Sequence, residues 1–118
     1  MEYRITFYKE SDGSQPVVDW LEALRKTDPV LEKLIVSGLD KLRNRQRHGP
    51  PLTKAVDDKN GIFELRVGKT NIARVFFFFQ PNQEIIATNG YVKKRQKLDQ
   101  GELHRAVRYK DDWEGRQG

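Results

Sequence analysis

Three strand-like segments follow one another in the second half of the chain, and they constrain the fold more than any other feature. They cover residues 61–68, 72–79 and 84–92, and each is rich in β-branched or aromatic side chains. The links at 68–71 and 80–83 contain the turn-forming residues Gly, Asn and Pro. Strands joined by such short turns pair in antiparallel orientation, so the sequence predicts an antiparallel meander.

The segments around this meander complete an α+β fold. Alternation of polar and apolar side chains predicts a strand over residues 3–8. Apolar residues at helical spacing then predict two helices, which are separated at residues 28–29 and end at the His-Gly-Pro-Pro of residues 48–51. Asp99 and Glu102 have the spacing of a capping box and predict a C-terminal helix. The predicted order is β-α-α-β-β-β-α, with a mostly antiparallel sheet.

The size and composition of the chain indicate one cytoplasmic domain. A chain below about 150 residues has too few apolar side chains for a second core, so we expect a single domain over residues 1–118. The longest apolar run, residues 75–79, is far shorter than the roughly 20 residues of a membrane helix. The chain has no cysteine and two distant histidines, so we expect neither a metal site nor a cofactor.

The charge balance favours an acidic partner. Lys and Arg number 22 against 17 Asp and Glu, which gives a formal net charge of +5. In so small a domain this excess is typical of proteins that approach phosphate backbones. The alternative is a basic surface that only keeps the protein in solution, and charge alone favours nucleic-acid binding only slightly.

A cluster of charged residues is expected on one face of the meander. The apolar residues of its first two strands alternate with a set that contains Glu64, Arg66 and Arg74. If both apolar sets face the same core, a three-residue turn places Arg66 directly opposite Arg74. Like charges in that position destabilise a sheet unless an acid or an anion bridges them. The pattern predicts a phosphate site, and the alternative is a surface cluster that only solvates the sheet.

A second basic group follows the last predicted strand. Residues 91–97 combine one tyrosine with four basic side chains in a loop, where lysines can hold phosphates and the ring can stack on a base. The alternative is a solvated loop. A third group, near the end of the second predicted helix, either complements the helix dipole or contacts RNA; it contains Arg43, Arg45 and Arg47.

Three motifs together resemble the HigB-like branch of the RelE toxins, also described as phage-derived Gp49-like proteins. They are residues 61–67, 73–78 and 89–97, and the resemblance extends over nearly the whole chain. It implies a compact sheet with two helices packed on one face and an endoribonuclease site on the other. The loop departs from the pattern, because residues 94–96 are Lys-Arg-Gln where relatives carry Thr or Ser before the Gln.

The resemblance also implies a function and partners. Such proteins cleave messenger RNA, usually on the ribosome, and their sites vary widely in the residues that do the chemistry. A cognate antitoxin with a helix-turn-helix domain neutralises them, and operator DNA is bound only through that antitoxin. By motif position we predict four catalytic residues, Arg66, Arg74, Lys93 and Lys94. We predict as RNA-binding residues Glu64, Tyr91, Gln96, Lys97, Arg43, Arg45 and Arg47.

The chemistry expected of such a site needs no metal. RNA carries its own nucleophile, the 2′-hydroxyl, so an enzyme has to align it, neutralise the phosphate and assist two proton transfers. Crowded cations can lower the pKa of a lysine toward a useful value. Two other hypotheses remain: a phage-derived module of the same fold that binds RNA or protein without cleaving, and a purely structural role for the charged face.

Overall fold

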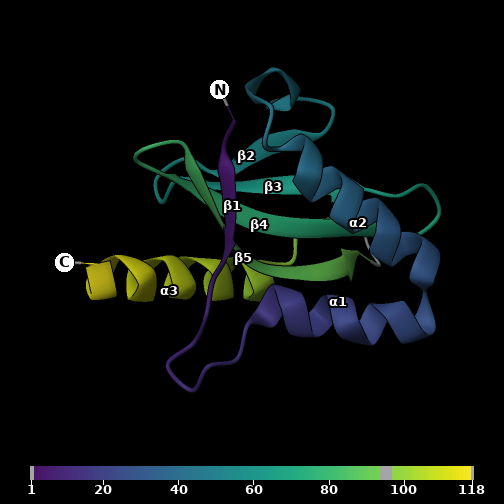
Figure 1. The fold of residues 1–118 in the computed structure, drawn as a ribbon, viewed down its shortest axis with the longest axis horizontal. Coiled ribbons are helices and arrows are strands. Elements are labelled where there is room, and N and C mark those ends of the chain that lie inside the picture. Colours follow the sequence, from purple (N-terminus) through teal and green to yellow (C-terminus); the bar gives the residue numbers. More distant parts are fainter. Residues whose placement is uncertain (1, 94–96, 118) are drawn as a thin grey trace.

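A five-stranded sheet forms the centre of the computed structural model, which describes residues 2–93 and 97–117 (Figure 1). The strand order is β1-β5-β4-β3-β2. β1 runs parallel to β5, and the other neighbouring pairs are antiparallel. The strands in chain order are β1 (Arg4–Phe7), β2 (Thr53–Asp57), β3 (Ile62–Val67), β4 (Ile72–Gln80) and β5 (Glu84–Lys93).

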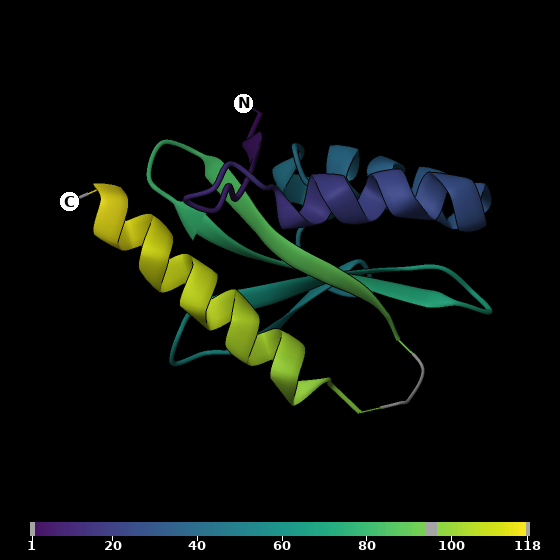
Figure 2. The same cartoon turned by 90° about the horizontal axis from the view of Figure 1, so that it is seen from below.

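Helices cover both faces of this sheet (Figure 2). α1 (Pro16–Thr27) and α2 (Pro29–Lys41) pack side by side on one face, and α3 (Gln100–Gln117) crosses the other. A short 3-10 turn, η1 (Arg45–Arg47), connects α2 with β2. The α+β class and the two N-terminal helices on one face are confirmed. Among the described residues, no helix is both long enough and apolar enough to cross a membrane.

Local chemistry explains where the helices begin and end. The side chain of Asp28 accepts a hydrogen bond from the backbone N–H of Leu31 at 3.1 Å and caps α2. Asp99 caps α3 through the N–H of Glu102 at 3.0 Å, as the capping-box spacing predicts. The prediction that the second helix extends to residue 48 is wrong. Its last turn tightens into i→i+3 bonds, including Leu42 N–H to the Leu39 carbonyl at 3.1 Å, and α2 ends at Lys41.

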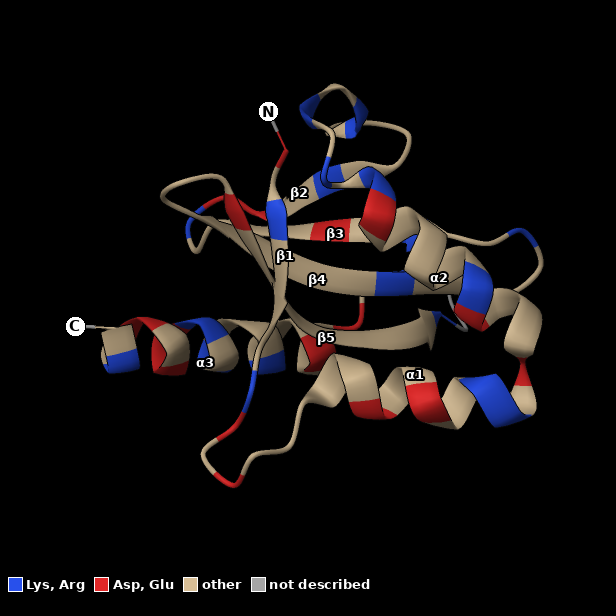
Figure 3. Cartoon of the chain, in the orientation of Figure 1, with Lys and Arg blue, Asp and Glu red and all other residues tan. Residues whose placement is uncertain are grey.

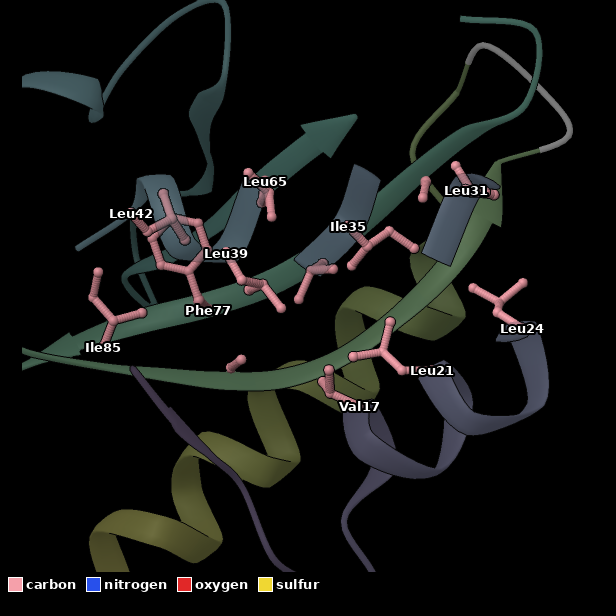
Figure 4. Close-up of a cluster of buried hydrophobic side chains, with 13 residues drawn as sticks. Val17, Leu21, Leu24, Leu31, Ile35, Leu39, Leu42, Leu65, Phe77 and Ile85 are labelled. Carbon is pink, nitrogen blue, oxygen red and sulfur yellow. The ribbon is translucent and has the colours of Figure 1, made fainter. Parts of the chain in front are cut away.

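The sheet is apolar on both faces. The alternation of side chains in the meander predicted a core on one face and did not predict the second. The predicted core residues, among them Leu65 and Phe77, pack against α1 and α2 (Figure 4). The opposite set also contains apolar residues, and Phe76 and Phe78 are fully buried under α3. Burying one such ring stabilises the fold by roughly 1.5–3 kcal/mol relative to leaving it exposed. α3 is therefore an integral layer of the domain.

A bulge in β5 separates its two halves. Ala87 pairs with Phe77 and Gly90 with Val75, so two residues, Thr88 and Asn89, oppose a single residue of β4. The side-chain amide of Asn89 donates to the backbone carbonyl of Glu102 at 3.1 Å and to its carboxylate at 3.0 Å. The bulge thus ties β5 to the first turn of α3.

Candidate nucleic-acid interface

The predicted charged face lies at the end of the sheet nearest the β3–β4 turn, on the side that α3 occupies. Arg66 pairs with Arg74, and Arg74 pairs in turn with Tyr91, so the three residues form one row across β3, β4 and β5. The predicted position of Arg66 opposite Arg74 is confirmed. α3 packs over the other end of this face and leaves Arg66 exposed (Figure 2).

Glu64 and Arg74 form a buried ion pair in this face. Nη1 of Arg74 donates to both carboxylate oxygens of Glu64, at 2.7 and 2.6 Å, and the side chains are 0% and 4% exposed for Glu64 and Arg74. The alternative of a solvated surface cluster is wrong for these two residues, because both are almost completely buried. Removing one partner of such a pair costs about 3–5 kcal/mol, since the other charge stays buried.

Lys93 lies two residues beyond Tyr91 on the same face of β5 and next to these arginines. Burial, with Arg74 and Arg66 as positive neighbours, lowers the pKa of Lys93. Glu64 opposes this effect because a negative charge favours the protonated amine. A lysine with a lowered pKa exchanges a proton more readily near neutral pH than an ordinary surface lysine does.

Sequence reasoning missed Lys54, a fourth cation of this face. It lies on β2 directly opposite Glu64 and is exposed. The predicted order β-α-α-β-β-β-α lacks this strand and is incomplete there, because only short alternation marks residues 53–57. The one available signal was the sequence Thr-Lys-Ala-Val, in which Lys54 alternates with smaller residues.

Tyr91 is a half-buried ring that borders the interface. Its centroid lies 5.8 Å from that of Phe76, and its hydroxyl accepts a hydrogen bond from the backbone N–H of Asp99 at 3.2 Å. Burial is the main cause that raises the pKa of Tyr91. The phenol therefore stays protonated at neutral pH, which leaves Tyr91 suited to stacking and unsuited to the role of a base.

A groove of about 570 Å³ opens between the end of β5 and the start of α3. Its lining combines Tyr91 and Lys93 with Lys97, Leu98 and Asp99. The predicted loop lysine Lys97 therefore lies at the interface. The predicted residues Lys94 and Gln96 fall outside the described residues.

The third predicted group, Arg43, Arg45 and Arg47, lies elsewhere. Arg43 binds Glu2 at 2.6 Å and Asp40 at 3.4 Å, while Arg45 lines a pocket together with Gln83. Gln83 precedes β5, whose other end carries Lys93, and the strand between them spans about 30 Å. Figure 3 shows the basic segments of η1 and of β4 as separate groups.

The two histidines take no part in the interface. The ring of His48 packs against Tyr3 at 4.8 Å and Phe79 at 5.5 Å, and its Nε2 contacts the carbonyl of Leu42 at 2.7 Å. His104 is exposed on α3. Within the described ranges, the charged chemistry of this face therefore rests on lysine, arginine and glutamate.

Comparison with known proteins gives one family. A family model described as phage-derived protein Gp49-like (DUF891) matches residues 19–111, more than three quarters of the chain. The match includes all four strands and the helix that build the interface, from β2 through most of α3. No curated protein matches the sequence.

Proposed function

Because the chain belongs to the Gp49-like family of phage-derived proteins, which is associated with toxin–antitoxin systems, we propose that it is a toxin that cleaves messenger RNA. Within this proposal it is a cytoplasmic relative of the RelE and HigB toxins and acts on messages bound to the ribosome. A helix-turn-helix antitoxin is its inhibitor and its only link to operator DNA.

One observation carries the proposal: four neighbouring strands each supply a cation to the same end of the sheet. These are Lys54, Arg66, Arg74 and Lys93, gathered around the carboxylate of Glu64. Such a cluster repels itself in the free protein and gains most from a polyanion that neutralises it. Lys54 and Arg66 are exposed, so a bound strand can reach these two cations.

The roles of the residues follow from their charge and burial. Arg66 and Arg74 neutralise the phosphate on which charge develops, and Lys93 exchanges a proton with the 2′-hydroxyl or the leaving oxygen. The O2′–P bond forms as the P–O5′ bond breaks, which leaves a cyclic phosphate and a 5′-hydroxyl. Tyr91 stacks on a base beside the reacting phosphate. Lys94 assists Lys93 in the catalytic role predicted for both, and Gln96 and Lys97 contact the flanking RNA.

The test is messenger-RNA integrity after induction of the chain without a partner. We expect new cuts within translated regions for the wild type, mapped by primer extension, and few or none for Arg66→Ala. Arg66 is exposed, so its removal leaves the fold intact, whereas loss of the buried Arg74 would not. Arg25→Ala, an exposed arginine on α1, is the matched control and should cut like the wild type.

A binding module without nuclease activity is the second candidate, and the absence of histidine from the described part of the interface favours it. It predicts RNA binding that weakens with salt and leaves the RNA intact, with or without ribosomes. Intact messages with abundant, folded wild-type protein would replace the first proposal with this one.

A further inference from the structure

The buried ion pair uses only one end of the Arg74 guanidinium. Both oxygens of Glu64 accept hydrogen bonds from Nη1. Nε of Arg74 is buried and has no hydrogen-bond partner among the described residues. Both hydrogen bonds to Glu64 come from Nη1, so they leave the edge formed by Nε and Nη2 unused.

The edge formed by Nε and Nη2 has the shape of an anion site. The N–H bonds of Nε and Nη2 point in parallel, at the spacing of two oxygens of one phosphate. A buried donor without a partner is unfavourable, and proteins retain such donors mainly where a ligand or a water completes them. The unpaired Nε therefore marks the side from which an oxyanion approaches Arg74.

Side chains that can move flank Arg74 in its row across the sheet. Arg66 lies opposite it on β3 and Tyr91 on β5, and Arg66 is exposed. A long exposed side chain can swing aside, whereas backbone cannot. Lys93 adds a second positive charge close by. An incoming phosphate thus meets movable cations before it reaches the fixed guanidinium.

We propose that Glu64 is a positioning residue, which holds Arg74 by Nη1 so that the Nε–Nη2 edge receives one phosphate of a bound RNA strand. In this arrangement Arg74 keeps its carboxylate partner while the phosphate is bound. The inference rests on the proposed function in that RNA is the ligand. It concerns binding alone and does not require that the RNA is cut.

Simple electrostatics predicts the opposite effect for Glu64. A carboxylate beside a phosphate site repels the ligand, so loss of its charge should tighten binding. If Glu64 instead fixes the orientation of the Arg74 guanidinium, its loss leaves Arg74 free to turn toward other acceptors. RNA binding then weakens. The sign of the change therefore separates the two views.

The experiment measures affinity for a 2′-O-methyl oligonucleotide, which cannot supply the attacking hydroxyl. We expect Glu64→Gln to weaken binding by about tenfold or more. Glu84→Gln is the matched control, because it removes the same charge at the far end of β5, where Glu84 pairs with Arg4 at 3.6 Å. Glu64→Gln protein that is folded and binds as tightly as the wild type, or more tightly, would overturn the proposal.

A measurement on the wild type keeps the proposal testable if Glu64→Gln does not fold. The Nε–H signal of Arg74 can be followed by nitrogen-resolved NMR and assigned through its loss in Arg74→Lys. We expect it to shift on titration with the oligonucleotide, in step with binding. A signal that stays in place while binding saturates would contradict the proposal. Binding with the expected shift but without cleavage of ordinary RNA would overturn the nuclease function and leave this inference standing.

Discussion

Gly90 shows how a residue without a side chain can shape a site. An added Cβ at this position would lie 2.4 Å from Cζ3 of Trp20, so the indole ring of α1 rests directly on the backbone of β5. Gly90 also follows the bulge and precedes Tyr91. The close packing of α1 therefore sets the path of the strand that carries Tyr91 and Lys93.

Replacement of Gly90 by alanine should destabilise the protein. The methyl group would push Trp20 or β5 away, and overpacking of this kind costs about 1–3 kcal/mol. Thermal or urea unfolding followed by Trp fluorescence measures the loss. Gly115→Ala is the control: nothing lies within 4 Å of a Cβ there, and alanine favours the helix α3, so stability should stay equal or rise. Equal stability of Gly90→Ala and wild type would disprove the packing argument.

The charge of Arg66 should set the pH dependence of Lys93. Burial, Arg74 and Arg66 lower the pKa of Lys93, and Arg66 does so because its positive charge disfavours a second proton nearby. In Arg66→Gln the pKa of Lys93 should rise. Glu64, which favours the proton, and Lys54, which disfavours it, are unchanged in that variant. Because Arg66→Gln is expected to cleave little RNA, the pKa of Lys93 is measured directly, by NMR titration of its side chain in the wild type and in this variant. An unchanged pKa would contradict the effect of Arg66 on Lys93.

The elements show what sequence alone could and could not predict. The register of β3 against β4 was predictable because strict alternation around Leu65 and Val75 allows one pairing. The burial of Glu64 was not, since a strand that alternates charged with apolar residues has the pattern of an exposed face. α3 covers that face, yet its sequence buries only Leu103 and Ala106. Because the helix has so few apolar positions, its sequence did not indicate that it completes the core.

The attachment of α3 rests on a hydrogen bond to the N-terminal segment. The hydroxyl of Tyr8 donates to the carboxylate of Asp112 at 2.5 Å. The ring of Tyr109 stacks on the ring of Tyr8, with the two centroids 4.5 Å apart. Arg116 binds both Asp112 and the backbone carbonyl of Lys9. Burial and the bond to Asp112 raise the pKa of Tyr8 to about 12. The bond to Tyr8 and that to Arg116 lower the pKa of Asp112.

The shift of Tyr8 predicts a loss of stability at high pH. The raised pKa of Tyr8 means that its contribution is complete below the ordinary value of 10 and disappears as pH rises toward about 12. Unfolding by denaturant at several pH values between 9 and 12 measures this loss. Tyr8→Phe should be less stable than wild type at pH 8 and should lose less on going to pH 12. A parallel decline in both proteins would refute the role of Tyr8.

At the scale of the whole molecule, two of the basic groups lie about 30 Å apart, near the two ends of β5. One is the interface with Arg66, Arg74 and Lys93. The other surrounds η1, where Arg45 and Arg47 are exposed. A short oligonucleotide reaches only the first, whereas a longer RNA can touch both.

The double variant Arg45→Ala/Arg47→Ala should therefore affect the binding of long RNA and leave the binding of short oligonucleotides unchanged. We expect unchanged affinity for an oligonucleotide of a few nucleotides and weaker binding of a long RNA, with a shallower dependence on salt because fewer counterions are released. Affinity measured across salt concentrations for both lengths tests this expectation. Arg66→Ala is the comparison and should weaken both ligands. Loss of affinity for the short ligand in the η1 variant would contradict the separation of the two groups.

The parallel pairing of β1 with β5 has a consequence for synthesis on the ribosome. Arg4 pairs with Glu84 and Phe7 with Ala87. β1, the first strand to leave the exit tunnel, therefore cannot pair until β5, the last strand, has been synthesised. Pairing across so many residues is slow, and until it occurs the nascent chain has neither a closed sheet nor an assembled cationic face. A polypeptide released before β5 is made would lack this cationic face and would be exposed to proteases, so the order of the strands delays assembly of the face until translation of the domain is nearly complete.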